Sequence, residues 1–365
     1  MIRVLHIGLS HQFGGIESFL LNLDRAIDRS EFHFDYVAYG STAPREDEFA
    51  VLGSTVHHLS NRRNPFAYVR ELIGLMGRGY DVVHVHKNSA ADVVPFMCAR
   101  CVPGLKVVAH AHNTSSGAGR VVPALNTLGR NVVVRCSDSL LACSAVAARW
   151  LYGAEADCAA LIPNGIDISA YAFDSAARER VRAELGVGDE IIVGCVGRFR
   201  KEKNQSFLAG VLGELLAGGV PARVLFLGDG TELEATKRAF EEAGLGDWAI
   251  FLGSVRNVAD YMQAMDVLAM PSLFEGLPLT AVEGQAAGLP VLLSDKITDE
   301  VCLTELAFRL PVTDDAAAKW AECIANNPYR GSRNVADIKA LEPFDARNTA
   351  TKVQRVYTEL VGHRA

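Results

Sequence analysis

The sequence predicts an α/β protein built from two Rossmann-like domains, each a parallel sheet wrapped by helices. Short apolar segments alternate with longer helical patterns, and this alternation restarts near residue 190. A chain of 365 residues also exceeds what one ordinary core accommodates. We expect a first domain over residues 1–165, a second over 166–344, and a C-terminal helix over 345–365 that packs at the domain junction.

The expected strands are apolar segments separated by helical patterns long enough to connect parallel neighbours. Those of the first domain are Ile2–Leu9, Phe34–Tyr39, Thr55–Leu59, Asp81–His86, Lys106–His112, Ser139–Cys143 and Ala159–Ile162. A polar helical connection follows over Tyr171–Asp189. The second series consists of Glu190–Phe199, Ala222–Leu227, Ala249–Leu252, Val267–Met270, Pro290–Ser294 and Phe308–Pro311. An amphipathic helix over Asp345–Leu360 follows them.

Composition indicates a globular protein, because 49% of the residues are hydrophobic and 22% are charged. No segment approaches the roughly 18 uncharged apolar residues that a membrane-spanning helix needs. The first strand starts directly after Met1, without the features of a signal peptide, so we expect a cytoplasmic protein. Cys98 and Cys101 have CxxC spacing, but no second pair follows, which favours two buried thiols over a zinc site.

Positive charge gathers in the first domain. Residues 1–165 hold 15 basic and 14 acidic side chains, whereas the remainder holds 21 and 29. Between Arg78 and Arg149 there are eight basic and three acidic residues, and the basic ones include Arg100, Arg120, Arg130, Arg135 and Arg149. Two interpretations stay open: an ordinary solvated surface, or a basic face that meets anionic lipid headgroups.

The segment Pro271–Pro290 combines two carboxylates with a helix N-terminus. Glu275 occupies a loop after a buried strand, and Glu283 lies eight residues later on a helix expected over Leu279–Ala287. The free N–H groups at the start of that helix suit a phosphate, and the carboxylates suit the diols of a sugar. The segment therefore predicts a nucleotide-sugar site, although two glutamates on an ordinary surface would leave the same pattern.

Two cations are expected at the same edge of the second sheet. Arg198 follows the first strand of the second domain, and Lys203 comes five residues later. Together with the helix N-terminus they would clamp a diphosphate without a metal ion, and the sequence contains no DxD pair. Loops around Gly228 and Val255 end the neighbouring strands and suit a flat base held against the backbone.

The first domain offers a glycine turn and four histidines. Gly14 and Gly15 allow a ligand to approach the backbone closely, although the GxGxxG pattern is absent. Alternation predicts that the histidines project in pairs near the ends of neighbouring strands, and they are His84, His86, His110 and His112. We favour buried, hydrogen-bonded histidines over a zinc site, and we expect Ala109–Thr114 to form an active-site rim.

Several of these motifs, in this order, resemble the retaining family 4 glycosyltransferases of the two-Rossmann GT-B fold, in the bacterial capsule and exopolysaccharide branch. The resemblance covers residues 2 to about 344, and its most specific feature is the spacing of Glu275 and Glu283 within Phe-Glu-Gly-Leu-Pro-Leu. The other matching segments are Gly14–Glu17, Ala109–Thr114, Ile162–Asp167, Val196–Phe199, Lys203–Asn204 and Leu227–Gly230. It implies two Rossmann-like domains that face each other across a cleft.

The resemblance also implies roles for individual residues. Arg198 and Lys203 would bind the donor diphosphate, Glu275 the hydroxyls of the transferred sugar, and Glu283 the ribose. Further donor contacts would come from Gly15, Gly228, Val255, Gly276, Leu277, Pro278 and Leu279. His112, with His110 as the competing choice, would lie near the reacting centre. Glu17 and Asn113 would border the acceptor.

The implied reaction moves a hexose or N-acetylhexosamine from a nucleotide sugar, with UDP the expected nucleotide, to a lipid-linked or oligosaccharide acceptor in surface polysaccharide synthesis. We expect no metal or other cofactor and no nucleic acid. Peripheral contact with an anionic membrane is one of the two open interpretations of the basic residues. A UDP-sugar 2-epimerase and a two-domain solute-binding protein remain the alternatives. The sequence does not choose the sugar, the nucleotide, the acceptor, the linkage or the oligomeric state.

Overall fold

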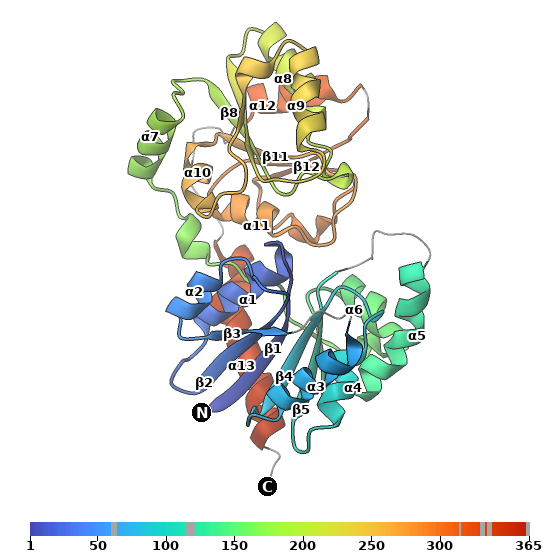
Figure 1. The fold of residues 1–365 in the computed structure, drawn as a ribbon. Coiled ribbons are helices and arrows are strands. Elements are labelled where there is room, and N and C mark those ends of the chain that lie inside the picture. Colours follow the sequence, from blue (N-terminus) through green and yellow to red (C-terminus); the bar gives the residue numbers. More distant parts are fainter. Residues whose placement is uncertain (60–63, 114–120, 314, 329–332, 334–337, 363–365) are drawn as a thin grey trace. The chain divides into compact units, whose positions relative to one another are not determined.

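The chain forms two compact units in this computed structural model (Figure 1). The first unit comprises Met1–Ile166 and Pro343–Ala365, and the second comprises Asp167–Glu342. The structure describes residues 1–59, 64–113, 121–313, 315–328, 333 and 338–362. Each unit is an α/β structure with its own parallel sheet, which confirms the predicted fold class.

The first unit contains a seven-stranded sheet in the order β3-β2-β1-β4-β5-β6-β7, and all its pairings are parallel. Its strands are β1 (Ile2–Leu9), β2 (Phe32–Tyr39), β3 (Thr55–Leu59), β4 (Val82–Lys87), β5 (Lys106–Ala111), β6 (Ser139–Ala142) and β7 (Ala160–Leu161). The expected strands differ from these by two residues at most at either end. The predicted and observed strands agree because the strands of a parallel sheet covered on both faces are continuous apolar runs, which are easily recognised in a sequence.

Helices cover both faces of the first sheet and enclose two apolar cores. The helices of this unit are α1 (Gly15–Ala26), α2 (Glu46–Val51), α3 (Pro65–Met76), α4 (Val94–Arg100), α5 (Val121–Arg135), α6 (Ala145–Tyr152), 3₁₀ turn η1 (Gly153–Cys158) and α13 (Ala346–Gly362). Side chains of α3 to α6 form one core, and those of α1, α2 and α13 form the other.

The second unit contains a six-stranded parallel sheet in the order β10-β9-β8-β11-β12-β13. The strands are β8 (Ile191–Val196), β9 (Ala222–Leu227), β10 (Ala249–Phe251), β11 (Val267–Met270), β12 (Val291–Ser294) and β13 (Ala307–Leu310). The first strand is shorter than the expected Glu190–Phe199, because Gly197 turns the chain with a φ of +142°.

Helices again pack on both faces of this sheet, around two apolar cores. They are α7 (Ser175–Glu184), α8 (Phe207–Ala217), α9 (Leu233–Glu242), α10 (Val258–Ala264), α11 (Leu279–Ala286) and α12 (Ala317–Ala325). Short 3₁₀ turns connect them at η2 (Ile168–Tyr171), η3 (Lys201–Lys203), η4 (Gly246–Trp248), η5 (Asp299–Val301) and η6 (Ile338–Phe344). Within the described residues, no helix has the length and apolar character required to cross a membrane.

Strand order reverses once in each sheet. In the first unit the reversal falls between β1 and β4, and in the second between β8 and β11. The loops that leave two such strands diverge to opposite faces, which opens a crevice at the carboxyl edge of the sheet. These two positions are therefore where the fold itself favours ligand binding.

The last helix, α13, belongs to the first unit although it follows the second unit in sequence (Figure 1). It packs beside α1 and β1, and its Tyr357 is fully buried. The Tyr357 hydroxyl lies 2.6 Å from Nδ1 of His84 on β4. A parallel bridge between Ile166 and Asp345 joins the outgoing and returning segments of the chain.

The two cysteines with CxxC spacing lie at the end of α4. Cys98 is buried, as expected, but Cys101 is exposed, so the prediction of two buried thiols was wrong for the second. Cys101 follows the last helical residue, where the chain turns toward solvent. Both thiols are free.

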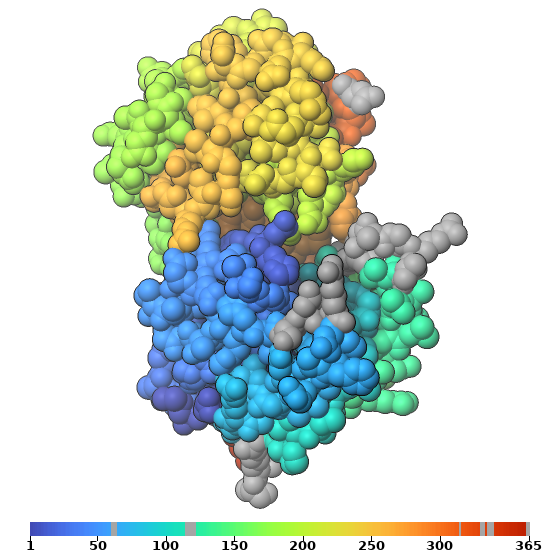
Figure 2. Space-filling view, in the orientation of Figure 1, coloured from blue at the N-terminus to red at the C-terminus, as the bar shows by residue number. Residues whose placement is uncertain are grey.

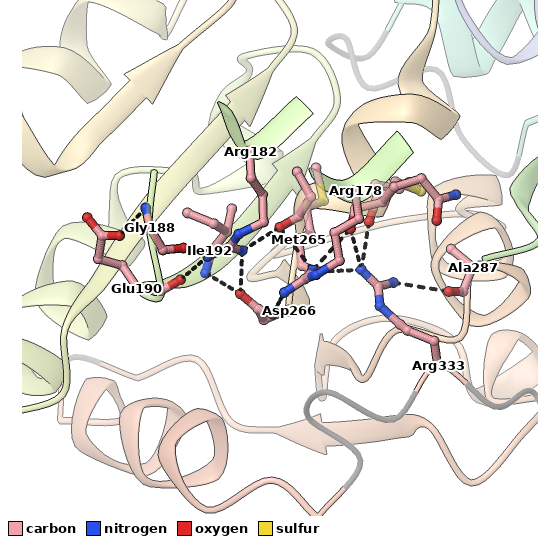
Figure 3. A network of polar contacts seen from close by, with 12 residues as sticks. Arg178, Arg182, Gly188, Glu190, Ile192, Met265, Asp266, Ala287 and Arg333 are labelled. Atoms are coloured by element: carbon pink, nitrogen blue, oxygen red, sulfur yellow. Dashed lines mark hydrogen bonds and ion pairs between the residues drawn. The ribbon is translucent and has the colours of Figure 1, made fainter. Parts of the chain in front are cut away.

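A network of arginines ties α7 to the second sheet (Figure 3). Asp266, which precedes β11, accepts from Arg178 at 2.6 Å, from Arg182 at 3.1 Å and from the backbone N–H of Ile192 at 2.8 Å. Arg333 adds hydrogen bonds to the carbonyls of Met262, Gln263 and Ala287. Burial, with the neighbouring Arg178, lowers the pKa of Arg333 to about 9.

Asp266→Ala should lower the free energy of unfolding of the second unit by about 3–5 kcal/mol, because it leaves two partly buried guanidinium groups without their counter-charge. Urea titration of the full chain measures the change. Asp260→Ala is the matched control. Asp260 lies on α10 and makes an exposed 3.5 Å ion pair with Arg180, which is on α7 like Arg178 and Arg182. It should cost less than about 1 kcal/mol. Equal losses in the two variants would contradict a structural role for the network.

Candidate active site

The strongest concentration of charged groups at a strand-order reversal lies in the second unit, between the loops that follow β8 and β11. The N–H of Leu273 donates to the carbonyl of Glu202 at 2.7 Å, and the side chain of Asn204 donates to the carbonyl of Pro271 at 3.2 Å. Asn204 adopts a left-handed conformation with a φ of +53°, which turns the chain directly after Lys203. These contacts hold the two loops together.

The joined loops bring Lys203 and Glu275 into contact. The ammonium group of Lys203 donates to Oε1 of Glu275, and the hydroxyl of Ser272 donates to the same oxygen at 2.9 Å. The side chains of Lys203 and Glu275 are 23% and 11% exposed, so the pair is mostly shielded but still reachable from solvent. A shielded, reachable ammonium group is suited to bind an incoming anion.

Helix α11 begins immediately after this loop, with Pro278 as its N-cap residue. Pro278 is buried, while Gly276, Leu277 and Leu279 are partly exposed. The first N–H groups of an α-helix have no acceptor within the helix, so this end of α11 is electropositive. Gly288, with a φ of +67°, ends the helix on the other side.

Glu283 lies one turn inside α11. Burial raises the pKa of its carboxyl group to about 7, although a hydrogen bond with Tyr171 acts in the opposite direction. Glu283 is therefore close to half ionised at neutral pH. A group that gains charge-assisted hydrogen bonds from a ligand would be fully ionised in the complex.

The remaining predicted donor residues of the second unit border the same edge of its sheet. Gly228, with a φ of +144°, packs directly on the Gly197 backbone: a Cβ atom there would lie 2.1 Å from the Gly197 carbonyl oxygen. Val255 is partly buried against the apolar core behind α11, and so is Leu277. Arg198 is exposed, and its carbonyl accepts from the side chain of Gln205 at 3.0 Å.

In the first unit, Gly14 is the N-cap of α1 and Gly15 is its first residue. A Cβ atom at Gly15 would meet nothing within 4 Å, so the protein's own packing does not require glycine there. Glu17 is buried, and its carboxylate accepts from the N–H of Ser10 at 2.8 Å. Glu17 thus holds the turn between β1 and α1, rather than facing solvent.

The histidines lie at the strand-order reversal of the first sheet and form a hydrogen-bonded chain. His6 Nδ1 is 3.0 Å from His86 Nε2, and His86 Nδ1 is 2.9 Å from His112 Nε2. The chain ends where His112 Nδ1 lies 3.0 Å from Oδ1 of Asn164. Both ring nitrogens of His112 are therefore engaged within the protein.

Burial distinguishes the two competing histidines. His110 is fully buried beneath Phe19 of α1, whereas His112 and its neighbour Asn113 are partly exposed. Burial lowers the pKa of His112 to about 3 and that of His110 well below its usual value, so both rings are neutral at pH 7. The rest of the expected rim, from Thr114 on, lies outside the described residues.

Within each unit some of the predicted residues lie together. In the second, Lys203, Glu275 and the start of α11 share one edge of the sheet, and in the first, the paired histidines share one face. Four polar partners of these residues were not predicted from the sequence, and they are His6, Asn164, Tyr171 and Ser272. The alternation His84-x-His86 could have suggested His6, since His6 pairs with His84 across the sheet.

Two sets of three histidine nitrogens lie close enough together to hold a metal ion, and both are in the first unit. One set is His6, His84 and His86, and the other is His86, His110 and His112. Across the described part of the second unit, no comparable group of histidine, cysteine or carboxylate side chains occurs.

Two family models match the chain. Residues 13–170 match the model described as Glycosyltransferase Family 4, and residues 190–326 match the model described as Glycosyl transferases group 1. Together they cover every strand of the two sheets except β1, and nearly every residue of the candidate site.

Curated relatives agree with these models. The chain is similar to "Putative glycosyltransferase EpsF" of Bacillus subtilis (strain 168), with 31% identity over 97% of this chain and 96% of the relative. It is also similar to the Escherichia coli "UDP-Gal:alpha-D-GlcNAc-diphosphoundecaprenol alpha-1,3-galactosyltransferase", with 23% identity over 84% of this chain and 82% of that one.

Solved structures share the fold. Anabaena HepE in complex with UDP and glucose superposes with a TM-score of 0.83 at 19% identity, over 98% of this chain and all of that one. WaaG, a glycosyltransferase involved in lipopolysaccharide biosynthesis, superposes with a TM-score of 0.67 at 15% identity, over 98% of this chain and all of that one. At these identities the likeness shows the GT-B fold.

The pKa of Glu283 predicts a pH-dependent stability. Its folded-state pKa of about 7 exceeds the value in the unfolded chain, so its contribution is complete at low pH and is lost as the pH rises through 7. The free energy of unfolding of Glu283→Gln, relative to that of the unmodified protein, should therefore rise by on the order of 2 kcal/mol from pH 5 to pH 8. Urea titrations at the two pH values measure this difference. Glu234→Gln, at an exposed site on α9, should show no such gain, and a flat difference for Glu283→Gln would contradict the assignment.

Proposed function

The chain belongs to glycosyltransferase family 4, and on this premise we propose that it transfers a hexose or N-acetylhexosamine from a UDP-sugar to a glycan acceptor, with retention of configuration. One observation carries the proposal: the Lys203–Glu275 pair lies beside the electropositive start of α11 at the strand-order reversal of the second sheet. Such a place suits an anionic leaving group next to a sugar.

We assign the donor to the second unit. Lys203, Arg198 and the first N–H groups of α11 would bind the diphosphate, and Glu283 would accept from the ribose hydroxyls. Glu275 is already oriented by Ser272, so it would keep its position when the diphosphate draws the ammonium group of Lys203 away. Its carboxylate would then accept from hydroxyls of the transferred sugar. The loops at Gly228 and Val255 would hold the base.

The proposed mechanism stabilises a departing diphosphate. Cleavage of the anomeric C–O bond leaves positive charge on the sugar and negative charge on the phosphate oxygens. Lys203 and Arg198 would each supply roughly 2.7–4 kcal/mol of differential stabilisation, by analogy with oxyanion donors. A leaving phosphate oxygen would take the proton of the acceptor hydroxyl, which then attacks from the same face. No carboxylate nucleophile and no divalent metal at the diphosphate take part in this scheme.

The first unit would contact the acceptor and the transferred sugar through Gly15 and His112. Open space beside Gly15 supports this role, because a ligand rather than the fold would then account for the glycine. His112 would act as a rigid neutral ring, since both of its nitrogens are held by the protein. Asn113 borders the same position.

We further propose a lipid-linked acceptor in exopolysaccharide or capsule synthesis, on the cytoplasmic side of the membrane. The names of the relatives support this: EpsF for the process, and the galactosyltransferase for a sugar carried on diphosphoundecaprenol. A UDP donor is supported by HepE, whose structure contains UDP.

A lipid acceptor calls for a membrane-facing surface, and we place it on α4 to α6 of the first unit (Figure 2). Apolar side chains are exposed there, with Leu128 at 74% and Met97 at 56%. Exposed arginines accompany them, and they are Arg100, Arg135 and Arg149. Arg130 is half-buried against Trp150, and Arg120 lies outside the described residues. Apolar groups ringed by cations favour an anionic bilayer.

The decisive experiment has two steps. Thermal shift over UDP-, GDP- and ADP-sugars identifies the donor, because a bound donor raises apparent stability. Product analysis then follows the donor with and without a lipid-linked acceptor. Glycosylated acceptor with retained configuration supports the proposal, whereas epimerised donor formed without acceptor would replace it with a 2-epimerase.

Lys203→Ala should lower kcat by about 10²–10³ while the protein remains folded, because the diphosphate loses its most closely held cation. Steady-state turnover at saturating donor measures the effect, and circular dichroism checks the fold. Lys201→Ala is the matched control, since Lys201 is exposed two residues away in the same turn. Full turnover in Lys203→Ala would remove this residue from the site.

The double substitution Leu125→Glu and Leu128→Glu should weaken binding to vesicles that contain anionic phosphatidylglycerol by about tenfold or more, because charge replaces apolar contact. Co-sedimentation measures the bound fraction. Val51→Glu changes an apolar side chain on α2 that is even more exposed, at 86%, and should bind like the unmodified protein. Equal binding by all three proteins would exclude this surface.

A further inference from the structure

Five imidazole rings meet inside the first unit, a concentration that the proposed transfer does not require. His6 lies on β1, His84 and His86 on β4, His110 on β5, and His112 directly after β5. The strand pairing sets His6 opposite His84 and His86 opposite His110. Adjacent ring centroids are 4.1 to 5.5 Å apart.

The ring nitrogens of this cluster are only partly satisfied. The chain from His6 through His86 and His112 to Asn164 uses five nitrogens, and Tyr357 uses one of His84. Among the described residues, no hydrogen-bond partner of normal geometry exists for either nitrogen of His110. Nε2 of His6 and Nε2 of His84 also lack a hydrogen-bond partner among the described residues. Buried polar atoms seldom lack partners, so an imidazole with two such atoms calls for a ligand.

We propose that His86, His110 and His112 form a binding site for a divalent transition-metal cation, with Zn²⁺ as the expected occupant. Each residue offers one ring nitrogen, and the three nitrogens lie within 4.8 Å of one another. Imidazole is a preferred ligand of zinc, nickel, cobalt and copper ions, whereas Mg²⁺ and Ca²⁺ require oxygen ligands. Three histidines leave one tetrahedral position for water.

The required rearrangement is small. Zinc–nitrogen bonds of about 2.0–2.1 Å in a tetrahedron separate two ligand nitrogens by about 3.3 Å. His86 Nδ1 and His112 Nε2 are now 2.9 Å apart, so they need to separate by a few tenths of an ångström around the cation. His110 makes no hydrogen bond of standard geometry among the described residues, so it would give up only its contact with the Ile162 backbone to turn a nitrogen toward them.

Two of the three proposed ligands already have hydrogen-bond partners that would orient their rings. With its proton on Nδ1, His112 donates to Oδ1 of Asn164 and leaves Nε2 for the metal. With its proton on Nε2, His86 donates to Nδ1 of His6 and leaves Nδ1 for the metal. Such partners fix the tautomer and the ring orientation of metal-binding histidines.

Access favours this set of histidines over the other one. In the set of His6, His84 and His86 every ring is at most 3% exposed, so no member of that set opens it to solvent. His112 is partly exposed and connects the proposed site with solvent. The site lies entirely within the first unit, and it would stand even if the proposed transfer reaction were wrong.

The test uses the untagged full-length chain, freed of metal with a chelator that is then removed. Isothermal titration with ZnCl₂ should show one equivalent bound with a micromolar or tighter Kd. Addition of CoCl₂ should give the visible absorption bands of tetrahedral Co²⁺ with nitrogen ligands. Lack of stoichiometric binding by the folded chain, or octahedral Co²⁺ spectra alone, would overturn the proposal.

Variants assign the ligands. His112→Ala and His110→Ala should each weaken Zn²⁺ binding by about 100-fold or more, and Asn164→Ala by about 10–100-fold through its effect on His112. His33→Ala and His58→Ala, at histidines outside the cluster, should bind like the unmodified chain. If His110→Ala does not fold, His112→Ala carries the test, because its side chain is partly exposed. Binding that persists in His112→Ala, or that is lost in His58→Ala, would refute this site.

Discussion

The contact between Lys203 and Glu275 depends on one constraint, the parallel pairing of β8 with β11. Because adjacent parallel strands end at the same edge, their loops meet although 72 residues separate the two side chains. The backbone contacts of Leu273 and Asn204 then fix the distance between the loops. Without a ligand, each charge of the pair neutralises the other. In the proposed function, an anion that binds Lys203 would free a carboxylate for neighbouring hydroxyls, and this would couple recognition of a phosphate to recognition of a sugar.

The first unit repeats the same geometry with neutral groups. Its reversal, between β1 and β4, gathers imidazoles whose pKa values are lowered by burial, so the cluster carries no charge at pH 7. His112 ends the hydrogen-bonded chain and is held through both nitrogens. A ring held in this way has a defined tautomer and cannot accept a proton until one of those bonds breaks. In the proposed transfer, His112 would therefore contribute through its position, and the charged groups would come from the second unit.

The sequence predicts the architecture well because a sheet covered on both faces leaves an unmistakable pattern of apolar runs. It also predicts the neighbours of Glu275, since motif spacing and strand ends locate Lys203 and α11. It does not predict Ser272, Tyr171 or Asn164, whose partners depend on side-chain distances between loops. The choice between His110 and His112 was out of reach for a similar reason: alternation places both on one face, and only solvent exposure separates them, since His110 is fully buried and His112 is partly exposed.

The return of α13 to the first unit has a consequence for biosynthesis. Tyr357 fills the core beside β4, and residues 167–342 fold as a body inserted between two parts of another. The ribosome delivers α13 after the inserted body, so until then one face of the amino-terminal sheet is covered by α1 and α2 without α13. The nascent chain thus exposes the apolar surface that α13 later covers while the inserted body is made, and a chaperone is expected to shield it.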